Sequence, residues 1–338
     1  MAPQPARATT VMQGGRVEER LASLEGAESA LVLGTGMAAV ACTMLSLLRS
    51  GDHLVASSWL SGDVRRFFET ELPNLGIDLA FVDPTETRGW RRMIRTNTRL
   101  LFLGTPVHST TRVADLNPPR LLAQELGIAL VVDSTYASPI NFRPIEHGAD
   151  VVIHAGDPYL HSEQGLQAGV VCGAQALIDE VREKMLLWGQ SPDAGMVAQL
   201  DRGLKTLDIR VARQNTNAEQ VARWAASQAS IRQTYYPGLP SHIDHEVAAA
   251  TLDGFGSTVV LDLGDDAVKA LRVTSRLRLF RSSAAIGGGE SLACALAASD
   301  TALSRSPQPL TISEGAVRLG IGLEDATDLI ADLAQALE

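Results

Sequence analysis

Three stretches of the sequence carry side chains that could do chemistry. Asp133 ends the apolar run LVVD, where a carboxylate could pair with a protonated ring nitrogen or simply cap a turn. The stretch GTGMAA, residues 34–39, leads into a helix, so free N–H groups at Gly36 and Met37 could bind a phosphate. Arg318 stands inside the apolar run GAVRLGIG, where its charge requires a carboxylate from the protein or from a ligand.

The turn that follows the run ADVVIH carries the other candidates. Asp157 and His161 lie in this turn, His154 ends the run, and His108 follows another apolar run. Each could act as a general acid or base, although a lone histidine is more often hydrogen-bonded in the packed interior. No metal-ligand spacing links these residues and the three cysteines stand apart, so we expect neither a metal site nor a disulfide framework.

The elements between these residues predict how they are positioned. Short apolar runs alternate with helical periodicity over about the first 200 residues, which is typical of a doubly wound α/β sheet with buried parallel strands. After Pro237 the pattern becomes shorter and mixed, with strands expected at STVVLDL, LRLFRSS and GAVRLGIG, which predicts a smaller α+β unit. We therefore expect an amino-terminal arm over residues 1–16, a large α/β domain over 17–213 and a small carboxy-terminal α+β domain over 214–338.

Composition excludes several classes of partner. A net charge of −10 opposes binding to nucleic acid or to an anionic membrane. The sequence shows neither the apolar core of a signal peptide nor a long uninterrupted apolar run, so we expect a cytoplasmic protein. Of the 29 basic residues only Lys184, Lys205 and Lys269 are lysines, which leaves few places for chemistry that needs an amine.

The sequence resembles the Cys/Met metabolism (transsulfuration) family of pyridoxal-phosphate (PLP) enzymes, the group of the cystathionine γ-synthases and γ-lyases. The resemblance runs through LASLEG, GTGMAAV, VVDSTYASPINFRPIEHGADVVIH, RGLKTLDIR, YYPGLPSHIDH, GGGESL and VRLGIGLEDATDLIADLAQAL. It implies PLP fold type I, the aspartate aminotransferase-like α/β fold, with a mostly parallel sheet in the large domain. It also implies that Gly36 and Met37 bind the phosphate, that Asp133 pairs with the pyridine nitrogen, and that Arg318 binds the substrate carboxylate.

The sequence departs from that family at the turn after ADVVIH. The family has a Ser-x-Thr-Lys-Tyr-Leu block whose lysine forms a Schiff base with PLP, whereas residues 155–160 read Ala-Gly-Asp-Pro-Tyr-Leu. Ala155 and Asp157 replace two phosphate donors, and Ser61 replaces a ring-stacking tyrosine. From these losses we expect no covalently bound cofactor and at most weak binding of PLP in a vestigial site.

Three functions remain open at this point. The first is a non-catalytic pseudoenzyme that acts as a structural or regulatory partner of an active relative. The second is a repurposed enzyme that uses Asp157, His108 or His161 as acid or base while Arg318 holds an amino-acid-like carboxylate. The third acts on a preformed aldimine of PLP with its substrate, with His161 as the base.

An active protein would be a lyase or transferase of the family type, with C–S lyase or γ-replacement chemistry. For partners we expect a homodimer or tetramer, or a heteromer with an active family member, and a small carboxylate ligand. We expect no nucleic acid and no membrane.

Overall fold

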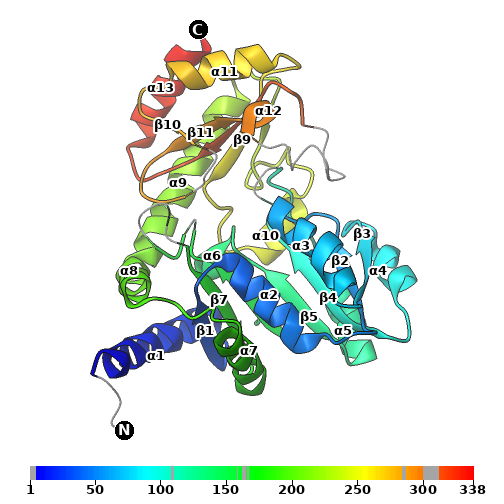
Figure 1. Ribbon diagram of the computed structural model, residues 1–338. Helices are drawn as coiled ribbons and strands as arrows, with labels where there is room; N and C mark the ends of the chain where they lie inside the picture. The colour runs from blue at the N-terminus through cyan, green and yellow to red at the C-terminus, as the bar shows by residue number, and fades with distance from the viewer. Residues whose placement is uncertain are drawn as a thin grey trace.

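The structure is a computed structural model that describes residues 5–107, 110–157, 159–161, 165, 167–283, 287–299 and 312–338, with side chains from residue 15 to residue 297 and from 312 onward. Two sheets dominate it (Figure 1). The small sheet and its helices lie above the large sheet in this view, and helix α9 (Leu207–Ala226) runs beside both. No described helix is long and apolar enough to cross a membrane.

The large sheet has seven strands in the order β1–β7–β6–β5–β4–β2–β3. They are β1 (Ser29–Leu33), β2 (His53–Ser57), β3 (Asp78–Val82), β4 (Thr98–Gly104), β5 (Ala129–Asp133), β6 (Val151–Ala155) and β7 (Gly169–Gly173). Strands β3, β2, β4, β5 and β6 pair in parallel, whereas β7 is antiparallel to both β6 and β1. The carboxyl ends of the parallel strands therefore meet at one edge, which is where ligands bind in such sheets.

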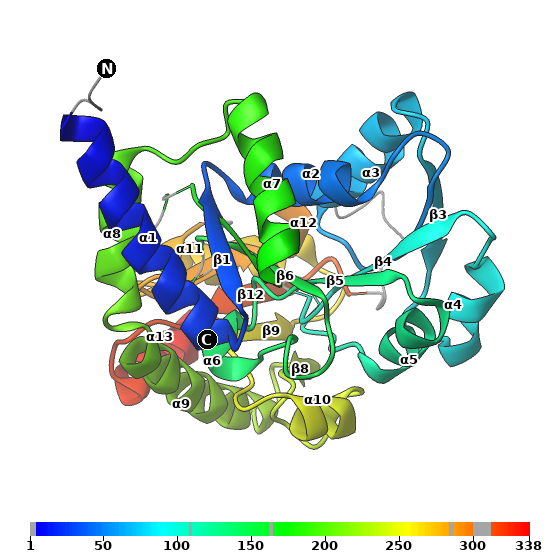
Figure 2. The ribbon, with the colours of Figure 1, turned by 90° about the horizontal axis from the view of Figure 1, so that it is seen from below.

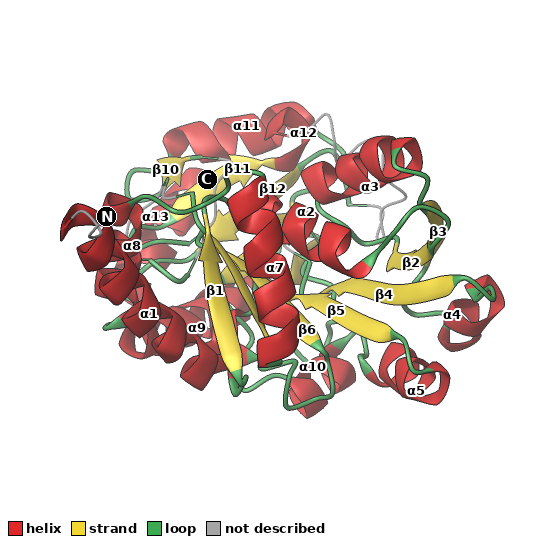
Figure 3. Ribbon diagram, turned by 60° about the horizontal axis from the view of Figure 1, so that its bottom comes forward, coloured by secondary structure: helices red, strands yellow, loops and turns green. Residues whose placement is uncertain are grey.

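Helices cover both faces of the large sheet, as fully buried strands require. One face packs against α2 (Gly36–Leu47), α3 (Gly62–Asn74) and α7 (Gln175–Leu187), which lie in front of the sheet in Figure 3. The other face packs against α1 (Pro5–Glu25), α4 (Thr87–Met93), α5 (Asn117–Leu126) and α8 (Ala194–Leu204). Helix α1 lies directly beside β1 (Figure 2). Because side chains alternate along each strand, every central strand contributes to both cores.

The small sheet has the order β10–β11–β12–β9–β8 and is mostly antiparallel. Its strands are β8 (Gln233–Tyr235), β9 (Thr258–Asp262), β10 (Arg281–Ser282), β11 (Leu292–Ala295) and β12 (Ala316–Gly320). Helices α9, α11 (Ala267–Arg276) and α13 (Ala326–Leu337) pack against it around a third core. The short helices α6 (Ser138–Asn141), α10 (His245–Thr251) and α12 (Leu296–Ser299) complete the described elements.

The predicted fold class is confirmed, with two differences in its elements. Helix α1 begins at Pro5, inside the expected amino-terminal arm of residues 1–16, and ends before Gly26, whose φ of 70° suits a glycine after a helix. The strand expected over LRLFRSS is confined to Arg281–Ser282. The two-domain division stays a prediction, and its boundary at residue 213 falls inside α9.

A buried ion pair joins two loops that are far apart in the sequence. Arg112 donates from Nε to Asp244 Oδ2 at 2.5 Å and from a terminal nitrogen to Oδ1 at 3.0 Å. The side chains of Arg112 and Asp244 are only 6% and 8% exposed, and the guanidinium lies 4.4 Å from the ring centre of Trp59. The pair therefore fixes the loop after β4 against the segment before α10.

We predict that Asp244→Asn lowers the free energy of unfolding by about 3–5 kcal/mol, because the change leaves a buried guanidinium without its counter-charge. Urea denaturation followed by circular dichroism measures the loss. The matched control is Glu125→Gln, which removes the carboxylate of the exposed pair with Arg91. Equal stabilities of the two variants would contradict the prediction.

Candidate functional site

A cavity of about 340 Å³ opens at the carboxyl edge of the large sheet. It is lined by Gly36, Met37, Val40, Ser61, Gly62, Asp63, Val64, Asp133, Thr135, Tyr136, Ile153 and Ala155. The three residues that the sequence assigned to a cofactor, Gly36, Met37 and Asp133, thus meet in one place. Ser61 and Ala155, two of the positions where the sequence departs from the family, line the same cavity.

The start of α2 presents backbone donors to this cavity. Thr35 is the N-cap, and its hydroxyl accepts a hydrogen bond from the N–H of Ala38 at 2.9 Å. The N–H groups of Gly36 and Met37 precede the first intrahelical bonds and lie at the positive end of the helix, which favours an anion. A Cβ at Gly36 would lie 2.9 Å from the Cβ of Ala155, so a larger residue would crowd this wall.

Thr135 holds the Asp133 carboxylate in place. Its hydroxyl and its backbone N–H donate to Asp133 Oδ1 at 2.5 and 3.1 Å, and the hydroxyl accepts from the N–H of Ala155 at 2.9 Å. Burial raises the pKa of Asp133, while the bonds from Thr135 and the charge of His154 act in the opposite direction. A cationic ring nitrogen in the cavity would offset the lost hydration of this carboxylate.

The turn after β6 contacts two other parts of the structure, the start of β9 and helix α8. Tyr159 is buried, and its hydroxyl lies 2.8 Å from Ser257 Oγ and accepts from the N–H of Ser257 at 3.2 Å. On the other side, a Cβ at Gly203 of α8 would lie 2.4 Å from the Cα of His161. The turn is therefore held between α8 and the start of β9.

The structure brings two of the acid–base candidates together. His161 Nε2 lies 2.5 Å from Asp157 Oδ1, and the two side chains are 3% and 42% exposed. Neither of them lines the cavity of Asp133. His108, the third candidate, and Pro158 lie outside the described residues.

Arg318 lies on the side of the small sheet that faces the large one. Its neighbours Val317 and Leu319 point into the small core, so Arg318 points away from that core, and it is only 4% exposed. Burial raises the pKa of Tyr136, and the positive charge of Arg318 opposes this rise. Arg318 and the cavity residue Tyr136 therefore lie within electrostatic range across the cleft.

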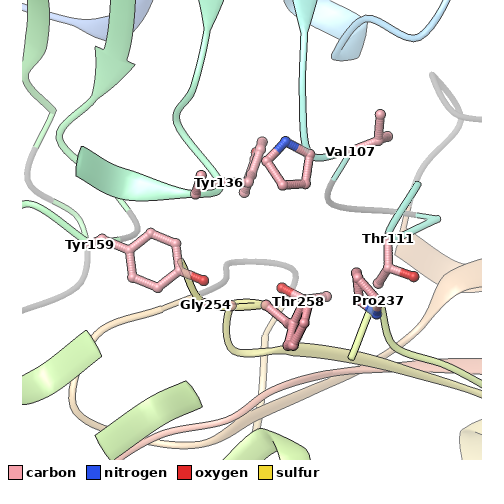
Figure 4. A pocket seen from close by; sticks show the side chains of 11 residues that line it. Val107, Thr111, Tyr136, Tyr159, Pro237, Gly254 and Thr258 are labelled. Carbon is pink, nitrogen blue, oxygen red and sulfur yellow. The ribbon is translucent and has the colours of Figure 1, made fainter. Parts of the chain in front are cut away.

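Tyr136 also lines two smaller pockets that continue from the cavity. One contains Trp59, Leu60, Val107 and Asp133, and is largely apolar. The other, of about 20 Å³, lies between the two sheets. Figure 4 shows Tyr136 and Val107 on one side of it, with Thr258 and Pro237 opposite.

All three lysines lie elsewhere in the structure. Lys184 is in the last turn of α7, Lys205 pairs with Asp201 at 2.7 Å, and Lys269 donates to backbone carbonyls near β9. None of them is among the residues that line the cavity of Asp133.

The sequence reasoning missed Thr135 and Tyr136 as site residues. The sequence pattern could have indicated both residues, because they closely follow Asp133 at the end of a predicted strand, where parallel sheets place ligand contacts. It also missed the partner of His154, which is the buried carboxylate of Glu25 at 2.8 Å.

The sequence is similar to known proteins over almost its whole length. A family model described as Cys/Met metabolism PLP-dependent enzyme matches residues 7–338. L-methionine gamma-lyase of Pseudomonas putida is 35% identical over 95% of this chain and 82% of its own length. Cystathionine gamma-synthase 1, chloroplastic, of Arabidopsis thaliana is 31% identical over 95% of this chain, which spans 58% of that longer relative.

The fold also matches a solved structure. The crystal structure of MetB from Corynebacterium glutamicum superposes with a TM-score of 0.91 at 30% identity, over 96% of this chain and 84% of that one. This likeness confirms the predicted PLP fold type I.

The comparisons overturn the expectation about the cofactor. From Pro158, Ala155, Asp157 and Ser61 we expected no covalently bound cofactor and only weak PLP binding, and that expectation is wrong. The family that matches almost the whole chain is PLP-dependent. The expectation rested on the turn after β6 and on Ser61, whereas Gly36, Met37 and Asp133 form other walls of the same cavity.

The described residues fit PLP at two points. The start of α2, with Gly36 and Met37, suits a phosphate, and the Asp133 carboxylate suits a protonated pyridine nitrogen. The two lie on the walls of one cavity of about 340 Å³.

We predict that Asp133→Asn makes the cofactor-free protein more stable at neutral pH. The folded-state pKa of Asp133 is raised above its unfolded value, so its contribution is lost as pH rises through the folded pKa. Asparagine avoids this loss, by about 1.4 kcal/mol per unit of pKa difference. Urea denaturation at pH 7 should favour the variant, and the difference should vanish below about pH 4.

The same variant should bind PLP about tenfold or more weakly, because a charge-assisted hydrogen bond is lost. Ser61→Ala, in the same cavity, is the control and should change the affinity little. A variant that is less stable than the wild type at pH 7 would contradict the raised pKa of Asp133. A variant that binds PLP as tightly as the wild type would show that Asp133 does not face the cofactor ring.

Proposed function

The chain belongs to the Cys/Met metabolism PLP-dependent enzyme family, and from this premise we propose that it is a pseudoenzyme of that family. It keeps the fold and the cofactor cavity but does not carry out the family's lyase or replacement reactions on its own. Its role is that of a structural or regulatory partner of an active relative.

The position of the lysines supports this proposal most directly. PLP, when bound, supplies an electron sink that stabilises a carbanion on an amino acid. The protein must supply a group that moves the substrate's proton, and an amine on the cavity wall is the usual means in this family. Lys184, Lys205 and Lys269 all lie away from the cavity, so this chain has no amine there for that task.

What the cavity residues do is bind and orient. The α2 N–H groups of Gly36 and Met37 suit the phosphate end, and Asp133, held by Thr135, suits the ring nitrogen. Arg318, on the facing sheet, suits the carboxylate of an amino acid. These groups are sufficient for a site that recognises a ligand without turning it over.

An exposed apolar patch at the end of α7 supports the role as a partner. Leu186, Leu187 and Trp188 are adjacent and are 64%, 77% and 53% exposed. Contiguous exposed apolar side chains of this size mark interaction surfaces. We propose that a second copy or a relative of the same fold covers them.

A second candidate function rests on the pair of Asp157 and His161. A carboxylate 2.5 Å from an imidazole can orient the ring for proton transfer. In this alternative the cleft is that of a repurposed enzyme, in which Arg318 holds an amino-acid-like carboxylate and His161 moves a proton.

We expect no release of 2-oxobutanoate from L-methionine or L-cystathionine when the purified protein is assayed with PLP, beyond the rate with PLP alone. An active relative in the same buffer is the positive control. Turnover by the wild-type protein would contradict the pseudoenzyme. If that turnover is also lost in His161→Ala while the variant remains folded, the second candidate function replaces the first.

We expect the protein to be a dimer or larger at micromolar concentration. Leu187→Glu places a charge in the apolar patch and should weaken the assembly by about a hundredfold or more, so that light scattering shows monomer. Leu121→Glu, at a site on α5 that is 55% exposed, is the matched control and should leave the mass unchanged. A monomeric wild-type protein would contradict the expectation.

A further inference from the structure

A buried acid–base pair lies on the side of the large sheet opposite the cavity. Glu25, the last residue of α1, and His154, on β6, are each 1% exposed, and Glu25 Oε2 lies 2.8 Å from His154 Nε2. Among the residues that the structure describes, none forms a hydrogen bond with Glu25 Oε1 or His154 Nδ1. Cys172 on β7 lies close enough that the charge of Glu25 adds to burial in raising its pKa.

Strand register places this pair directly behind Asp133. Asp133 on β5 is in register with Ile153 on β6, and both line the cavity. His154 is the next residue of β6, so its side chain leaves the sheet on the opposite face, where α1 packs. One strand spacing, about 5 Å, separates the two backbones.

The pair presents its imidazole, and not its carboxylate, to the side of the sheet where Asp133 lies. A cationic imidazole would neutralise the buried Glu25 carboxylate, whose Oε2 lies 2.8 Å from His154 Nε2. A lone carboxylate in this interior would be costly, whereas the ion pair is neutral as a whole. The imidazole is nearer to Asp133 than the carboxylate is, since Glu25 approaches the ring from the α1 side.

We propose that Glu25 is a positioning residue for the cofactor cavity: by keeping His154 cationic behind the sheet, it keeps the Asp133 carboxylate ionised toward a ring nitrogen. The inference does not rest on the proposed function, because it concerns the charge state of the cavity and not turnover. Helix α1 is thereby part of the cavity's electrostatics although it does not line it.

A double-mutant cycle on the full-length protein tests the proposal. The probe is pyridoxine 5′-phosphate, which has the ring nitrogen and the phosphate but no aldehyde, so covalent attachment plays no part. Glu25→Gln removes the charge but keeps the shape, and should raise the dissociation constant about three- to tenfold. In an Asp133→Asn background the same change should have no further effect, because the group that senses the charge is gone.

Nitrogen-15 NMR of histidine-labelled, cofactor-free protein gives a second readout. His154, assigned with a His154→Asn variant, should be doubly protonated at pH 7 in the wild type and singly protonated in Glu25→Gln. Leu21→Ala, at another buried position of α1, is the structural control and should leave both the protonation of His154 and the coupling unchanged.

Two results would overturn the proposal. A neutral His154 in the wild-type protein would remove its premise, and this measurement needs no variant that alters Glu25. An equal loss of probe affinity on Glu25→Gln in the wild-type and Asp133→Asn backgrounds would show that the pair only anchors α1. Neither result depends on whether the protein turns over any substrate.

Discussion

An ionised carboxylate loses hydration when it lies at the end of a buried strand, and the cavity of this protein is built around that constraint at Asp133. Thr135 supplies two hydrogen bonds to it, and the cation on His154 acts from behind the sheet. Both contributions are smaller than the cost of burial, so the carboxyl pKa remains raised. A ligand with a protonated ring nitrogen would offset the remainder.

The fold was predictable where burial alone determines the pattern of apolar residues. Residues 54–56 and 130–132 are uninterrupted apolar runs because helices cover both faces of their strands. LRLFRSS looked similar but forms only a two-residue edge strand. Leu277 and Phe280 are apolar because they pack into the small core, and that contact needs no strand pairing.

The site was predictable where the chemistry is local in the sequence. Gly36 and Asp133 could be assigned from the turn and strand end that carry them, and the structure brings them into one cavity. Contacts between distant segments could not be predicted. His154 contacts Glu25, which is 129 positions away in the sequence, and the charge of Arg318 in the small sheet acts on Tyr136. Both interactions arise only when whole elements pack together. The cofactor expectation was wrong for the same reason, because it was drawn from individual positions and not from the cavity that distant elements form together.

Tyr159 gives the turn after β6 a mechanical role. Its hydroxyl is bound to Ser257 at the start of β9, while the backbone at His161 rests against Gly203 of α8. A ligand that displaces this turn must also displace the small sheet or α8. For such a ligand, occupancy of the cleft and the arrangement of the two sheets would be thermodynamically linked, and a protein that binds one arrangement would change ligand affinity by the same factor with which the ligand changes that binding.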